Sequence, residues 1–141
     1  MNRTFLARAL ALAVALVSAN ALAAWTPVGE LFDGSGFYDK ASIKKSGDTA
    51  RVKILVNFKQ PDPPKNGARG AASSLAVMEF DCVKPLARRV SVEGRSEKDG
   101  KGFVTKENTT MGAWKSINVE NFTHQDPLLR LRRIACPAGK E

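Results

Sequence analysis

Two cysteines and one histidine are the residues of this 141-residue chain that are best suited to covalent chemistry. In an oxidising compartment Cys82 and Cys136 are expected to pair, because two thiols in a small exported domain usually form a disulfide. The bond would close a loop of 55 residues, which the chain-entropy model values at about 4 kcal/mol of stabilisation. The alternative is a reactive thiol with His124 as its base.

Other catalytic signatures are missing from the sequence. His124 is the only histidine, and no further metal ligands stand at a recognisable spacing from it. Gly-x-Ser-x-Gly, phosphate-binding glycine loops and His-Glu-x-x-His do not occur. Glu79 and Asp81 share one face of a predicted strand, where we expect them to meet basic residues of the following strand. The sequence therefore predicts no enzyme, no cofactor and no metal site.

Basic residues are concentrated in one segment. The chain has 22 Lys and Arg against 14 Asp and Glu, and residues 84–106 carry seven basic and three acidic side chains. The candidate contacts to an acidic partner are Lys84, Arg88, Arg89, Arg95, Lys98 and Lys101, and Lys106 belongs to the same surplus. This predicted hairpin is either a surface for polyanions, anionic lipid headgroups or acidic proteins, or a solvated edge whose charges prevent strand pairing.

The chain begins with the features of a secretory signal peptide. Basic residues precede an apolar run over 9–17, and Ala21-Leu22-Ala23 fits a small-x-small cleavage site. We predict a signal peptide over 1–23 and one exported domain over 24–141. The alternative, an uncleaved anchor helix, would need a longer apolar core, and no later stretch is long enough to span a membrane. Cleavage removes two arginines and leaves a net charge of +6.

Strands dominate the rest of the sequence. Thr49–Phe58 alternates apolar and polar residues, and apolar Leu55 at a polar position predicts a strand covered on both faces. Shorter strands are expected over 25–31, 37–38, 73–82, 87–93 and 103–105, with turns at 33–36 and 46–48, a corner at 39–42 and a loop over 60–70.

The C-terminal segment changes to a helical period. Asp126 followed by Pro127 is typical of a helix start, and Pro137 predicts its end. The apolar face is expected to consist of Leu128, Leu131, Ile134 and Ala135. The predicted fold is α+β and mainly β, a twisted antiparallel sheet of about five to six strands with one C-terminal helix. The Cys82–Cys136 disulfide would tether that helix to the sheet.

Short motifs in a fixed order cover nearly all of the predicted exported domain. They are Trp25, Tyr38-Asp39-Lys40-Ala41-Ser42-Ile43, Gly47 with Arg51-Val52, Glu79-Phe80-Asp81-Cys82, Trp114-Lys115-Ser116-Ile117 and Ala135-Cys136. Together they resemble the surface-adhesin protein E family of small exported bacterial domains. The resemblance implies a twisted antiparallel sheet with a C-terminal helix, and adhesion through host extracellular proteins. It transfers no binding residue to this chain.

These observations favour an exported, non-catalytic binding or adhesion-type domain. Its partners would be extracellular or envelope proteins or polyanions, not nucleic acid, since DNA readout is not expected of an exported protein. No cysteine near the cleavage site offers a lipid anchor, so the periplasm is expected, with the cell surface and secretion as alternatives. The alternative function is a periplasmic structural or envelope-stress protein that acts through protein contacts without a host ligand. The sequence leaves both a monomer and a homodimer open.

Overall fold

The computed structural model describes residues 23–61, 70–117 and 126–137. Residues 1–22 of the predicted signal peptide, most of the predicted loop over 60–70, and His124 lie outside these ranges. The described elements are β1 (Trp25–Leu31), β2 (Gly34–Ser46), β3 (Thr49–Phe58), β4 (Ser73–Asp81), β5 (Leu86–Arg95), a 3-10 turn η1 (Lys98–Gly100), β6 (Val104–Asn108), β7 (Lys115–Ser116) and α1 (Pro127–Ala135).

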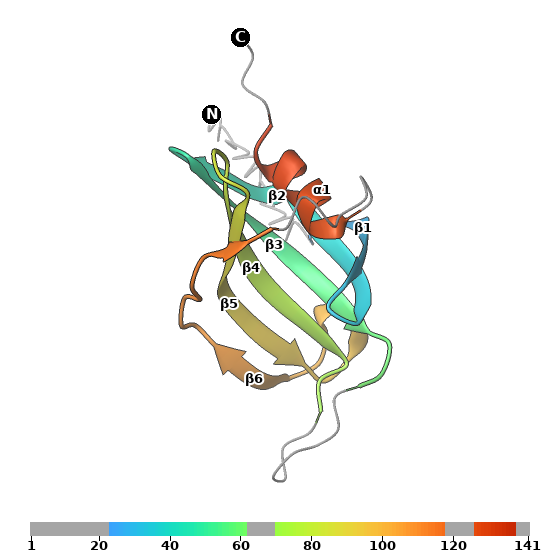
Figure 1. Cartoon of the computed structure of the whole chain (residues 1–141). Coiled ribbons are helices and arrows are strands. Elements are labelled where there is room, and N and C mark those ends of the chain that lie inside the picture. Colours follow the sequence, from blue (N-terminus) through green and yellow to red (C-terminus); the bar gives the residue numbers. More distant parts are fainter. Residues whose placement is uncertain (1–22, 62–69, 118–125, 138–141) are drawn as a thin grey trace, which may run out of the picture.

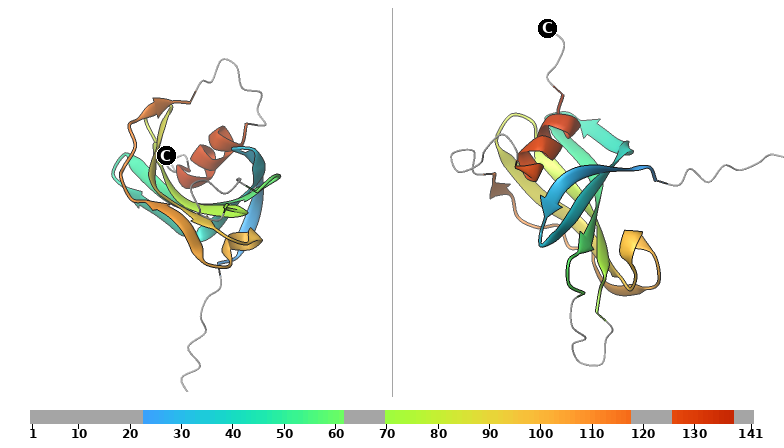
Figure 2. Two further views of the ribbon diagram at one scale, coloured as in Figure 1. Left: turned by 90° about the horizontal axis from the view of Figure 1, so that it is seen from below. Right: turned by 90° about the vertical axis from the view of Figure 1, so that its right-hand side faces the viewer.

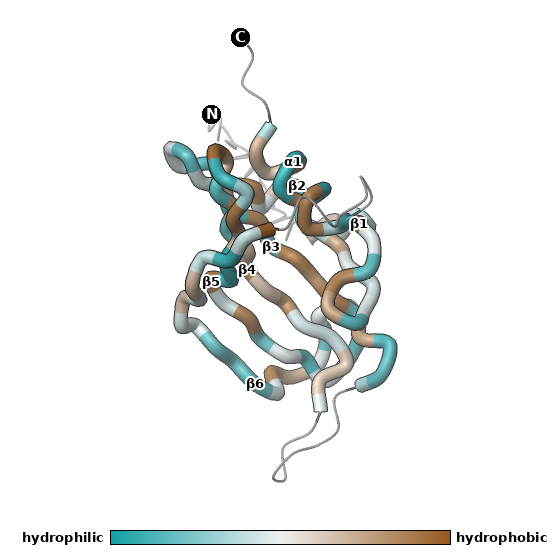
Figure 3. The backbone as a smooth tube through the Cα atoms, in the orientation of Figure 1, coloured by the Kyte–Doolittle hydropathy of each residue, from teal (hydrophilic) through white to brown (hydrophobic). Residues whose placement is uncertain are grey.

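The described strands form one antiparallel sheet in the order β1-β2-β3-β4-β5-β6, and β7 pairs with the first residues of β5. The sheet is strongly curved, and α1 lies across one end of its concave face (Figures 1 and 2). This arrangement confirms the predicted fold class, a mainly β domain with an antiparallel sheet and one C-terminal helix. Hydrophobic residues gather in the central strands and α1, whereas most of β6 is hydrophilic (Figure 3).

Strand β3 is covered on both faces, as the apolar residue at position 55 predicted. Val52, Ile54 and Val56 belong to the core on the concave side. Leu55 is also buried, and its cross-strand neighbour Leu75 packs beside η1 on the convex side. The Ser73 hydroxyl fixes η1 there, because it donates to the carbonyl of Glu97 at 2.6 Å and accepts from the amide of Gly100 at 3.1 Å.

The turn predicted at 33–36 is wrong, because Gly34 and Gly36 lie within β2. The connection is instead Phe32-Asp33, and both residues adopt positive φ (46° and 65°), as a two-residue type I′ hairpin turn requires. Close packing explains why glycines occupy positions 34 and 36 of this strand. A Cβ on Gly34 would overlap the carbonyl of Asn57, and a Cβ on Gly36 would lie 2.7 Å from the carbonyl oxygen of Gly29.

The predicted corner at 39–42 is a bulge inside one continuous strand. The register of β2 against β3 shifts between Asp39 and Lys44. The Asp39 carboxylate accepts the amide of Ala41 at 3.0 Å, and Ser42 Oγ donates to the Asp39 carbonyl at 2.6 Å. The predicted turn at 46–48 is confirmed, with Gly47 at a φ of 57°.

Helix α1 begins where the sequence predicts. The Asp126 carboxylate accepts the amides of Leu128 and Leu129 at 2.8 and 3.2 Å. The predicted apolar face is partly wrong, because Leu129 is buried whereas Leu128 and Ile134 are only half-buried. The helix contacts β1 and β2 as well as β3, so more than one of its sides is enclosed.

Candidate binding surfaces

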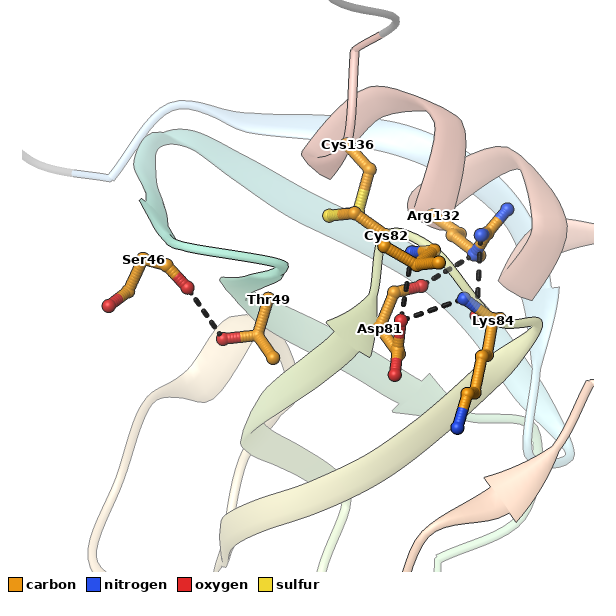
Figure 4. Close-up of a disulfide and its surroundings, with 8 residues drawn as sticks. Ser46, Thr49, Asp81, Cys82, Lys84, Arg132 and Cys136 are labelled. Carbon is orange, nitrogen blue, oxygen red and sulfur yellow. Dashed lines mark hydrogen bonds between the residues drawn. A yellow bond between two sulfur atoms is a disulfide. The ribbon is translucent and has the colours of Figure 1, made fainter.

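The disulfide end of the molecule is the first surface with a defined geometry. Cys82 and Cys136 are bonded at an Sγ–Sγ distance of 2.06 Å, which joins the β4–β5 turn to the C-terminal end of α1 (Figure 4). The predicted pairing is confirmed. The reactive-thiol alternative is wrong, because both cysteines are used in the bond.

Hydrogen bonds around the disulfide hold three segments together. Arg132 Nε and Nη2 donate to the carbonyls of Asp81 and Lys84 at 2.9 and 3.3 Å (Figure 4). The Cys82 amide donates to the carbonyl of Asp48 at 2.7 Å, which attaches the β2–β3 turn. The Asp81 carboxylate accepts the amides of Lys84 and Val83, both at 2.8 Å, and these bonds lower the pKa of Asp81 below its ordinary value.

Five cations gather on these same three segments, and we call them the disulfide-end cluster. They are Lys44 and Lys45 at the end of β2, Lys84 in the β4–β5 turn, and Arg132 and Arg133 in the last turn of α1. Within the described residues none of the five forms an ion pair. Sequence reasoning placed only Lys84 in a candidate site, because the other four are distant from it in the chain and only the topology and the disulfide bring their segments together.

The structure distributes the six predicted contact residues over separate places. Arg88 bonds Glu79, and Arg95 bonds Glu93, so two of the six cations are engaged by carboxylates. Arg89 projects from the concave face, since it pairs with the buried Met78. Lys84 precedes β5, whereas Lys98 and Lys101 follow it. Both lysines are exposed at the opposite end of that strand, Lys98 as the first residue of η1 and Lys101 just after it.

Glu79 is the centre of a charged cluster on the convex face. Its side chain accepts Arg51 Nε at 3.0 Å and Arg88 Nη2 at 3.2 Å. The Arg88 guanidinium also stacks over the Trp114 ring, 4.3 Å from its centroid. The predicted contact with a basic residue of the next strand is confirmed for Glu79. It is wrong for Asp81, whose carboxylate accepts the backbone amides of Val83 and Lys84 instead. Arg51 was not predicted, because it reaches Glu79 from the preceding strand.

The concave face contains an apolar cavity of about 640 Å³. The central strands form its floor, while the 112–117 segment and α1 close its sides. The described residues that line it are Phe32, Ile54, Val56, Phe58, Ser74, Ala76, Met78, Ala87, Arg88, Arg89, Val92, Gly112, Ala113, Lys115, Ser116, Ile117 and Leu128. Three of these are basic and none is acidic. No motif in the sequence indicated this cavity, because its wall residues come from many separate elements.

Two further properties concern the described residues alone. In these ranges, no three His, Cys, Asp or Glu side chains lie close enough to hold a metal ion. None of the helices in this part of the chain has the length and apolar character needed to cross a membrane.

Comparison with solved structures finds the same fold in protein E of Haemophilus influenzae. One crystal form of that protein superposes with a TM-score of 0.53 at 18% identity, over 72% of this chain and 79% of that chain. The protein E structure from a non-typeable strain gives a TM-score of 0.57 at 13% identity, over 81% and 78% of the two chains.

Sequence comparisons complete the assignment. A search of curated proteins returned no match. The family model described as Surface-adhesin protein E matches residues 25–137, which include every described strand and the helix. This chain therefore belongs to the Surface-adhesin protein E family.

Proposed function

We propose that this chain is an exported, non-catalytic binding domain of the adhesin type, and that the disulfide-end cluster contacts an acidic protein or polyanion. The observation that carries this proposal is that Lys44, Lys45, Lys84, Arg132 and Arg133 lie on or beside three segments joined at the disulfide end, and that none of the five has an ion-pair partner among the described residues. Membership of a family of surface adhesins supports a role in binding.

The geometry of the disulfide end suits such a surface. The Cys82–Cys136 bond and the Arg132 hydrogen bonds fix the segments that carry the cations. A preorganised charged surface loses little conformational entropy when it binds. The five cations outnumber Asp48 and Asp81, the carboxylates on the same segments. A surplus of positive charge attracts an acidic surface over roughly 8 Å at physiological ionic strength, the Debye length, so binding must weaken as salt is added.

Immobilised heparin tests this proposal as a defined polyanion. We expect the purified exported protein to be retained at low salt and released as salt rises. A Lys84→Glu/Arg133→Glu variant should lose retention. A Lys98→Glu/Lys101→Glu variant is the matched control, because it changes the same total charge on exposed residues at the opposite end of β5. Loss of retention in the control alone would assign binding to the η1 region instead, and unchanged retention in both variants would refute both surfaces.

The site of action needs a separate experiment. Family membership implies an exported surface protein, whereas the sequence predicts the periplasm. Protease added to intact cells should degrade a surface-displayed protein and spare a periplasmic one. Protection from protease, together with cross-linking to envelope proteins only, would favour the alternative role as a periplasmic structural or envelope-stress protein.

A further inference from the structure

We propose that the cavity on the concave face binds a fatty acid, with the acyl chain in the apolar interior and the carboxylate at Arg89 and Lys115. This site is separate from the disulfide-end cluster. It concerns a small ligand and not the macromolecular partner proposed above.

The size and lining of the cavity suit an acyl chain. Its volume of about 640 Å³ lies within the roughly 300–1,000 Å³ of small-molecule sites. The floor consists of side chains such as Ile54, Ala76 and Val92, which share one cross-strand row. Serines 74 and 116 are the only uncharged polar side chains among the described lining residues. A flexible apolar chain would meet few unpaired polar groups in such a cavity.

Charge at the cavity wall selects an anionic headgroup. Arg89 pairs with Met78 and Lys115 with Ala87. Both partners belong to the concave core, so both cations project from that face. Neither cation forms an ion pair within the described residues, and no carboxylate is among the lining residues described. Arg88 is different, because its guanidinium is already bound to Glu79.

Phe32 adds an independent indication at the β1–β2 turn. This side chain lines the cavity and is 57% exposed. Its φ of 46° is one that residues with a Cβ rarely adopt. Positive φ at Phe32 and Asp33 is what the two-residue turn requires. The turn places this exposed aromatic ring at the cavity wall, where it would provide further apolar contact for a bound chain.

Calorimetric titration of the delipidated, exported protein with palmitate tests this site. We expect saturable binding of one palmitate per chain, weakened by salt. Laurate and myristate should bind more weakly, by roughly fourfold for each methylene group removed, because each buried methylene contributes a similar increment. Hexadecanol should bind more weakly than palmitate, because it lacks the carboxylate. Phosphatidylglycerol vesicles distinguish the source, since binding to vesicles without binding to palmitate would overturn the fatty-acid assignment.

Two variants separate the apolar and ionic parts of the site. Ala76→Phe fills the cavity floor and should weaken palmitate binding at least tenfold. Arg89→Glu changes an exposed residue, so the fold is retained, and it should weaken palmitate binding while leaving hexadecanol binding unchanged. Lys98→Glu is the matched control on the convex side and should bind palmitate like the wild type.

Three results would overturn the fatty-acid site. The first is that palmitate shows no saturable binding. The second is that wild type and Arg89→Glu bind palmitate with equal affinity. The third is that the chain forms a dimer that Ala76→Phe disrupts. The last result would assign the cavity to a second copy of the chain. Heparin retention should be unaffected by Ala76→Phe, so failure of this site and failure of the proposed function are distinguishable.

Discussion

At the scale of single residues, Glu79 is the least exposed charged residue among those described, at 4%. It neutralises Arg88 in a partly buried position and also binds Arg51. Removing one partner of a buried charge pair leaves the other without compensation. We expect Glu79→Gln to lower the free energy of unfolding by about 1.5–3 kcal/mol, the range for hydrogen bonds to charged groups, as measured by urea denaturation.

Arg51→Gln is the control for this prediction. The Arg51 side chain is 47% exposed, against 23% for Arg88. Solvent screens the exposed arginine, so its loss should cost at most about 1 kcal/mol. An equal loss for Glu79→Gln and Arg51→Gln would show that burial of the carboxylate does not determine the energy of this cluster.

Asp81 should make stability depend on pH. Hydrogen bonds from the amides of Lys84 and Val83 lower the pKa of Asp81 below its ordinary value of 3.8. The ionised carboxylate therefore stabilises the fold above that value, and this contribution is lost as the pH falls through the lower pKa of the folded state. Asp81→Asn keeps an acceptor oxygen but loses the charge, so the variant should be less stable at neutral pH.

The pH series itself provides the check on Asp81. In urea denaturation, the gap between wild type and Asp81→Asn should narrow below pH 3.8 and close at still lower pH. A gap that stays constant across this range would show that the charge of Asp81 does not contribute to stability.

Individual residues could be predicted where the signal was local. Asp126 was recognisable as a helix cap because its partners are two and three residues away. The contact of Glu79 with Arg88 followed from strand alternation between consecutive strands. The position of Phe32 in the β1–β2 turn could not be predicted, because the nearby glycines are better turn formers. Only the packing of Gly34 against Asn57 shows why glycine is needed in the strand instead.

At the scale of elements, we expect α1 to depend on its covalent attachment to the sheet. The helix has nine residues, and isolated helices shorter than about 12–15 residues are marginal in water. A Cys82→Ser/Cys136→Ser variant should lose up to about 4 kcal/mol of unfolding free energy, the chain-entropy value for this loop. Urea denaturation measures the loss, and a reducing agent should lower the wild type to the level of the variant.

The Cys82→Ser/Cys136→Ser variant is the control for this prediction, because the reducing agent should not change its unfolding free energy. If reduction leaves the unfolding free energy of the wild type unchanged, then packing alone fixes α1 against the sheet.

The positions of strands and of the helix could be predicted from periodicity, but the number of sides on which each is covered by other elements could not always be predicted. The pattern over 49–58 gave the bounds of β3 and its coverage on both faces. The pattern of α1 did not identify Leu129 as buried, because one helical period assumes one covering surface, whereas β1 and β2 also contact this helix. The bulge after Asp39 appeared in the sequence as a corner, since local hydrogen bonds of Asp39 and Ser42 resemble those of a turn.

At the scale of the whole molecule, the candidate surfaces depend on topology. A surplus of basic residues was evident in 84–106, but the strand order places Lys84 and Lys98 at opposite ends of β5. The same topology brings the Arg132 side chain to the carbonyl of Lys84, 48 residues earlier in the chain. The count of charges along a sequence therefore indicates which kind of partner a protein could bind. Only the fold shows which of the charged residues share one surface.

The order of local opening should follow this topology. Strands β3 and β4 lie inside the sheet and carry much of the core, whereas β6 pairs with β5 alone. Regions with few buried contacts open at lower free energy, so native-state hydrogen exchange should be slowest in β3 and β4 and faster in β6. Reduction of Cys82–Cys136 should accelerate exchange in α1 while β3 and β4 stay protected. If the sheet and helix lose protection together on reduction, then they form one cooperative unit in which the disulfide stabilises the core as well as the helix.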